Sequence, residues 1–285
     1  MSISKQNRAI RVAVITDSTA SIPEHVRIAA GVNVVNLHVL AGAQSFQENV
    51  DITPTECAQL IAQKKPLTTS QPTPADFERA LQQAWDAGFD EAVLVLISSA
   101  LSGTVSTART VAEASDRTVQ VVDSQTSGMA LGFAAVAAGR AAAGGLSADE
   151  VAAAAALAAA GSGAYFLVDS LDHLRRGGRL GAAAAALGTL LGLKPILTID
   201  DSGKIVVSSK VRSRAAALGH LAQHARDAVE AGASGIAVHY FGEPDRARAL
   251  ADELRREVQV PVYLSSASAV LGSHVGPGLV AVTFA

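Results

Sequence analysis

The sequence predicts an α/β protein of two domains, and two patterns along the chain carry that prediction. Short apolar runs rich in Val and Ile alternate with segments of helical period, as in βαβ units built around a parallel sheet. Later in the chain, two such runs are joined by the turn Asp200-Asp-Ser-Gly203, which predicts a hairpin and therefore some antiparallel pairing. The 285 residues suffice for one large or two ordinary domains. We expect a mostly parallel sheet with flanking helices in residues 8–160, and a mixed-sheet α/β domain in residues 161–285.

Three apolar runs in the first half predict strands, and each continues into a turn rich in Ser, Thr or Asp. They are Arg11–Ile15, Ala92–Ile97 and Val119–Val122. Continuous runs of Val, Ile and Leu are typical of strands that are covered on both faces in a parallel sheet. With helices between them, these strands predict the covered sheet of an α/β domain.

Helix starts in the first half are marked by residues that satisfy the free N–H groups of a first turn. Capping boxes predict three of these starts, and a Thr-Pro pair predicts a fourth. The starts are Ser21, Thr53, Thr73 and Ser147. After Thr73, the spacing of Phe77, Leu81 and Trp85 predicts one buried helix face, with Trp85 as a core anchor.

Glycines indicate how the two halves are joined. Gly139 to Gly145 predicts a linker and Gly161 to Gly163 a break, with an Ala-rich helix between them. We place the domain boundary at the break. Beyond it we expect strands and one charged helix, at residues 164–168, 195–199, 204–208, 235–240, 260–264 and 278–284 for the strands and 244–258 for the helix.

Composition excludes several classes of protein. Hydrophobic residues make up 49 % of the chain and charged residues 17 %, which excludes a disordered protein. A net charge of −3 does not favour nucleic acid as a partner. A single cysteine, Cys57, cannot form a disulfide within the chain, so we expect a cytoplasmic protein. The apolar stretches Val151–Val168 and Leu180–Leu193 are interrupted by glycines, and we expect no transmembrane segment.

The common catalytic signatures are missing from the sequence. It has no phosphate-binding P-loop, no dinucleotide fingerprint and no Gly-x-Ser-x-Gly elbow. His220 and His224 are four residues apart, but they fall on a predicted surface helix beside charged residues. We therefore expect no metal site and no catalytic residue.

Hydroxyl groups gather in two segments: Thr68–Pro72, which precedes a predicted helix, and Ser98–Thr104, which lies between a predicted strand and a helix. Ligands of open α/β sheets bind beyond the carboxyl ends of the strands, where a helix N-terminus offers free N–H groups. Such a site suits a carboxylate or a phosphate. The alternative is that these residues only cap helices, and spacing alone leaves both interpretations open.

Three further segments allow a functional and a structural interpretation. In Ser273–Gly278, glycines permit close backbone approach and His274 can donate to an anion, or the segment is a simple turn. The segment from Ser170 to Arg214 holds eight basic residues and three acidic ones. This positive charge can bind an acidic partner or a phosphate, or the basic side chains are simply exposed to solvent. The small side chains of Leu180–Leu193 favour either an apolar tunnel or close core packing.

Seven motifs, taken in order, resemble the DegV family of fatty-acid-binding proteins over roughly residues 10 to 285. They are Ile15–Ala20, Thr69–Pro72, Ser98–Thr104, Val122–Ser124, Leu174–Gly181, Lys210–Arg212 and His274–Gly278. The resemblance implies the two-domain DegV-like fold with one long-chain fatty acid at the domain junction. It implies no cofactor besides this ligand and no catalysis by the protein itself.

The resemblance also implies roles for single residues. Thr69 and Ser102 match the hydroxyls that hold the carboxylate, Ser99 is a possible neighbour, and His274 matches a histidine close to the carboxylate. Members of the family present this head group to a separate fatty acid kinase, which makes an acyl phosphate for phospholipid synthesis. Arg176 and Arg212 match arginines that are plausible contacts for that partner or its phosphate.

Two rival functions stay open at this stage. One is an α/β enzyme for a small carboxylated or phosphorylated metabolite, with His274 as acid or base. That enzyme needs a polar pocket, whereas a fatty acid needs a long apolar tunnel. The other is a regulatory module that binds nucleic acid through the basic segment Arg175–Arg214, against which the acidic remainder of the chain argues.

Overall fold

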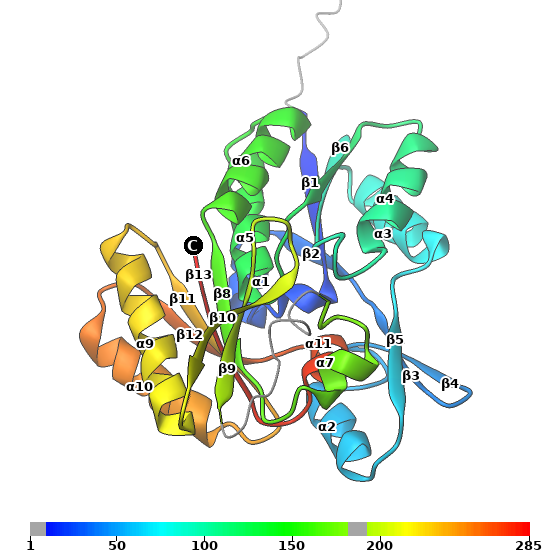
Figure 1. The fold of residues 1–285 in the computed structure, drawn as a ribbon. Helices are drawn as coiled ribbons and strands as arrows, with labels where there is room; N and C mark the ends of the chain where they lie inside the picture. The colour runs from blue at the N-terminus through cyan, green and yellow to red at the C-terminus, as the bar shows by residue number, and fades with distance from the viewer. Residues whose placement is uncertain (1–9, 182–192) are drawn as a thin grey trace, which may run out of the picture.

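The computed structural model describes residues 10–181 and 193–285, and these residues form three β-sheets (Figure 1). The strands of the six-stranded sheet come from residues 163–284, and those of the two smaller sheets from residues 12–123. The protein is thus an α/β protein with one parallel and one mixed sheet, as the sequence predicts. The domain boundary at residue 161 stays a prediction.

The parallel sheet has the strand order β2-β1-β6-β7 and helices on both faces. Its strands are β1 (Val12–Asp17), β2 (Val32–Val35), β6 (Glu91–Leu96) and β7 (Val119–Asp123). Helices α3 (Pro74–Asp86) and α4 (Thr104–Glu113) cover one face, and α5 (Met129–Ala143) and α6 (Ala148–Ala160) cover the other. β1 is buried throughout, whereas β7 is an edge strand and is only half-buried.

A small antiparallel sheet, which the sequence analysis did not predict, has the order β4-β3-β5. Its strands are β3 (His38–Ala41), β4 (Gln44–Gln47) and β5 (Leu67–Ser70), with α2 (Pro54–Ala62) between the last two. Val39 and the buried thiol of Cys57 pack into one core with Phe166 and Phe241 from the second half. This sheet therefore contributes to the contact between the halves.

The mixed sheet of the second half has the order β10-β9-β8-β13-β11-β12. The strands are β8 (Gly163–Leu167), β9 (Lys194–Ile199), β10 (Ile205–Val211), β11 (Ile236–Phe241), β12 (Val262–Ser266) and β13 (Leu279–Phe284). Helices α9 (Arg214–Glu230) and α10 (Asp245–Glu257) cover one face. The other face packs with the short helices α7 (Asp172–Arg176) and α11 (Ala269–Val275) and with the small sheet. β9 and β10 form the predicted hairpin.

Two local predictions were wrong. The segment from Gly139 is not a linker, because α5 continues to Ala143; a side chain at Gly139 would overlap the carbonyl oxygen of Ala30, so the glycine lets α5 pack closely against the end of α1 (Glu24–Ala29). Ser21 does not cap α1, since it has a φ of 50° and ends the 3-10 turn η1 (Ser18–Ala20).

The other helix starts are confirmed as capping boxes, at Thr53, Thr73 and Ser147. Trp85 is only half-buried, and the Arg117 guanidinium lies 4.8 Å from its ring centre. Most of the segment Leu180–Leu193, for which the sequence left a tunnel and core packing both open, lies outside the described residues. None of the helices that the structure describes is long and apolar enough to cross a membrane.

Candidate functional site

A cavity of about 260 Å³ lies between the carboxyl edge of the parallel sheet and the inner face of the mixed sheet. Its walls are mainly apolar and come from both halves of the chain: Leu37, Ile97, Leu101, Phe166, Leu174, Ile199, Ile205, Val270, Leu271, Val275, Leu279 and Ala281. Ile97 follows directly after β6, at the edge of an open parallel sheet where ligands bind. The interior is therefore suited to an apolar ligand that reaches from one sheet to the other.

Polar side chains from several elements line the same cavity, among them Ser127, His239 and Thr283. Thr69 at the end of β5, Ser102 in the turn before α4 and His274 on α11 all belong to its wall. The Thr69 Oγ1 atom lies 2.7 Å from His274 Nε2, and Ser102 Oγ lies 2.8 Å from the Thr104 hydroxyl. The structure thus brings together three of the four residues that the sequence assigned to the carboxylate.

The polar end holds hydrogen-bonding groups that are mostly uncharged. Burial, reinforced by the nearby charge of Arg179, lowers the pKa of His274 to about 4. The imidazole is therefore neutral at pH 7, with one ring N–H and one acceptor nitrogen. Together with the Thr69 and Ser102 hydroxyls, it can turn donors toward an anion.

Two glycines explain why motifs far apart in the sequence meet here. Gly177 has an ordinary φ, but a side chain there would overlap the His274 ring at Nδ1. A side chain at Gly103 would likewise overlap the carboxamide of Gln71, which bonds through Nε2 to the Thr107 hydroxyl at 2.9 Å. Both glycines serve close approach rather than an unusual backbone angle.

Arg179 is a cavity residue that the sequence analysis missed. Its Nε donates to the Leu101 carbonyl at 3.1 Å, so it also ties the segment after α7 to the turn that carries Ser102. It is the last arginine of the run Arg175-Arg-Gly-Gly-Arg179. Its place in that motif is the one feature of the sequence that could have indicated a role at the cavity. It is a fixed positive charge beside the polar end.

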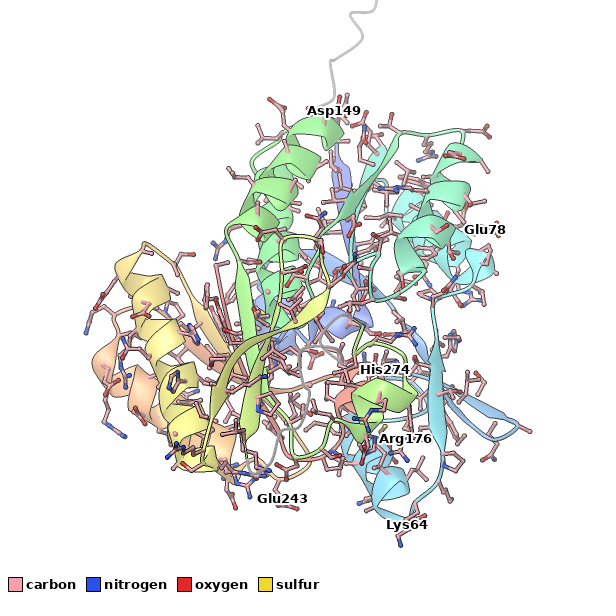
Figure 2. The ribbon with its side chains drawn as sticks, in the orientation of Figure 1. Lys64, Glu78, Asp149, Arg176, Glu243 and His274 are labelled. Carbon is pink, nitrogen blue, oxygen red and sulfur yellow. The ribbon has the colours of Figure 1, made fainter. Side chains whose placement is uncertain are left out.

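The remaining predicted residues lie outside the cavity wall. Ser99 is exposed, and its backbone N–H donates to Asp123 at 3.1 Å, as in a structural turn. Arg176 is exposed on α7, next to the helix that carries His274 (Figure 2). Arg212 is exposed directly after β10.

The turn that carries Ser102 is fixed at its start by two side chains. Asp17 is fully buried and accepts from the Ile97 N–H at 2.7 Å; burial raises its pKa, although hydrogen bonds from Thr19 and Ile97 act in the opposite direction. The Ser98 hydroxyl donates to the Gly203 carbonyl at 2.9 Å. This second bond joins the first half to the β9–β10 hairpin, whose strands supply Ile199 and Ile205 to the cavity.

Among the described residues, no three His, Cys, Asp or Glu side chains come together in a way that would hold a metal ion. His220 and His224 are four residues apart in the sequence. His224 stacks on Tyr165, with the ring centres 3.7 Å apart. The cavity combines a mainly apolar lining with a group of mostly neutral hydrogen-bonding side chains, and this combination suits a ligand with an apolar body and an acidic head.

This chain belongs to the DegV family, whose model, described as that of uncharacterised DegV proteins, matches residues 11–285. A DegV domain-containing protein of Streptomyces coelicolor is 41% identical over 273 residues, which cover 95% of this chain and 97% of that protein. Two solved structures also resemble it, a DegV family protein from Thermus thermophilus described by its fatty acid binding (33% identity, TM-score 0.87) and DegV, a fatty acid binding protein from Bacillus subtilis (30% identity, TM-score 0.88). Each match covers 96% of this chain and 99% of the other.

Proposed function

We propose that this protein binds a long-chain fatty acid at the junction of its two halves and presents the carboxylate to a separate fatty acid kinase. One observation carries the proposal: a single cavity joins apolar walls from both sheets to the group Thr69, Ser102 and His274. The fatty acid binding described for solved members of the family supports it. The kinase would form an acyl phosphate for phospholipid synthesis in the cytoplasm.

The energetics favour an acyl chain in such a cavity. A sixteen-carbon acid buries roughly fourteen methylenes at about 0.8 kcal/mol each, or about 11 kcal/mol before the costs of ordering and immobilisation. Removing the carboxylate from water costs several kcal/mol unless it is hydrogen-bonded. Thr69, Ser102 and neutral His274 supply donors, and Arg179 supplies a positive charge, so the head group can stay ionised.

Presentation to a partner requires contacts at the protein surface. Arg176 and Arg212 are exposed and meet this requirement. A guanidinium there can dock an acidic surface or hold two oxygens of the phosphate that is transferred. In this proposal the protein holds its ligand and the kinase carries out the chemistry.

The direct test is the mass of any molecule released from the denatured, purified protein. We expect one fatty acid of sixteen to eighteen carbons per chain. Protein that is repeatedly empty and takes up no added palmitate would refute the proposal. Release of a small polar metabolite would instead favour the rival enzyme, although the mainly apolar lining of the cavity does not suit one.

A further inference from the structure

The short helix α11 decides the shape of the polar end, because four of its side chains line the cavity: Val270, Leu271, His274 and Val275. With seven residues it is too short to be stable on its own, so its place is set by what holds it. A shift of its first turn moves His274 with respect to Thr69, which belongs to the small sheet. The contacts at the start of α11 therefore bear on ligand binding.

The first turn of α11 is held from two sides. The Ser268 hydroxyl accepts from the Leu271 N–H at 3.1 Å, as an ordinary N-cap does. The Val270 N–H donates instead to Glu48 Oε1 at 3.0 Å, across 222 positions of sequence. Glu48 follows β4 in the first half of the chain, and its own N–H donates to the Leu37 carbonyl at 2.9 Å. The backbone that carries the Glu48 carboxylate is therefore itself held in place by a hydrogen bond.

Glu48 is costly for the fold, which argues for a role beyond filling space. It is fully buried, and its second oxygen, Oε2, accepts no hydrogen bond from the described residues. A buried carboxyl with an unused oxygen lowers stability relative to an apolar side chain of similar volume. Burial raises the pKa of Glu48 to about 7 against hydrogen bonding that favours the ionised form.

Other polar contacts also join α11 and its N-cap to the first half. The Ser268 N–H donates to the Ser21 hydroxyl at 3.1 Å, and the Thr69 hydroxyl lies 2.7 Å from His274 Nε2. The Cys57 sulfur, on α2, lies 3.3 Å from the Ser273 hydroxyl and 3.5 Å from the Ala269 carbonyl. A thiol is a poor donor and a poor acceptor. We propose that Glu48 is a positioning residue for lipid binding: its carboxyl holds the first turn of α11 and thereby sets where His274 stands beside Thr69. This inference rests on the proposed function.

The test compares palmitate affinity and the NMR signals of the His274 imidazole in Glu48→Ala and in the wild type. We expect Glu48→Ala to bind palmitate at least tenfold more weakly and to shift the His274 ring signals in the ligand-free protein. Glu48→Gln keeps an oxygen for the Val270 N–H and should restore both. Where Glu48→Ala does not fold, Glu48→Asp serves instead, because it withdraws the same acceptor by one methylene.

Leu254→Ala is the matched control, since Leu254 is fully buried on α10, on the opposite face of the mixed sheet. It destabilises the fold without contacting α11, and should leave both readouts unchanged below its melting temperature. Unmoved His274 signals in Glu48→Ala, or equal losses in Leu254→Ala, would overturn the inference. If the wild type itself takes up no palmitate, the proposed function fails, while the His274 signals still report whether Glu48 positions α11.

Discussion

Replacing Gly177 by alanine tests the link between the motif of α7 and the candidate head-group site. The new Cβ would sit roughly 1 Å inside ordinary van der Waals distance of His274 Nδ1, so the imidazole has to move by about that much. The hydrogen bond between Thr69 Oγ1 and His274 Nε2 is 2.7 Å long. A shift of about 1 Å in any direction misaligns this bond, and one that lengthens it takes it past the roughly 3.5 Å at which such bonds fail.

Loss of one aligned donor to a charged head group costs about 1.5–3 kcal/mol, so Gly177→Ala should weaken palmitate binding about ten- to a hundredfold. Isothermal titration calorimetry measures this directly. Gly219→Ala in α9 is the control, because nothing described lies within 4 Å of a Cβ there. It should keep the affinity of the wild type and stabilise the helix by about 0.5–1 kcal/mol.

A double-mutant cycle identifies the route of the effect. If Gly177→Ala acts through the His274 ring, it should cost little further affinity in a His274→Ala background, since both changes remove the same interaction. Full additivity, or a folded Gly177→Ala protein with the affinity of the wild type, would refute the reasoning.

Three more predictions concern the head group, the partner and a buried acid. Thr69→Val and Ser102→Ala should each weaken palmitate binding about ten- to a hundredfold by calorimetry; unchanged affinity in both, with intact circular dichroism, would contradict the assignment. Arg176→Ala and Arg212→Ala should still copurify with fatty acid but support little acyl-phosphate formation in a kinase assay, and parental turnover at every salt concentration would place the docking elsewhere. Burial raises the pKa of Glu48 from 4.5 to about 7, so its contribution to stability is complete below about pH 4.5 and is lost as the pH rises through about 7. Relative to Glu48→Gln, the wild type should lose about 3 kcal/mol of unfolding free energy between about pH 4 and about pH 8, measured by urea denaturation; parallel pH curves would contradict this.

Much of the architecture is encoded in short stretches of sequence. The runs at residues 12–15 and 92–96 are entirely apolar, and they form most of the two central strands of the parallel sheet, β1 and β6. Thr53, Thr73 and Ser147 mark their helix starts because the cap and the N–H groups it satisfies lie within three residues of each other. Such signals are local, so they are legible without the rest of the chain.

The small sheet was missed for the opposite reason. Its strands have four residues each, and Gln44–Gln47 and Leu67–Ser70 are largely polar, so no apolar run marks them. They pair because β3 lies between them and packs Val39 into the core between the halves. Burial of that core, rather than local propensity, decides that these segments are strands.

The sequence by itself determined the fold class, most of the strands, several of the helix starts, and the motif segments that resemble the DegV family. Only the tertiary structure decided that Thr69, Ser102 and His274 share a cavity wall while Ser99 does not, and that Arg179 and Glu48 take part. Periodicity and capping act between residues a few positions apart, so each segment carries its own signal. The candidate site is built from the end of β5, the turn before α4 and the helix α11. These segments meet only because the whole chain buries their apolar surfaces together, and that burial is complete only in the folded protein.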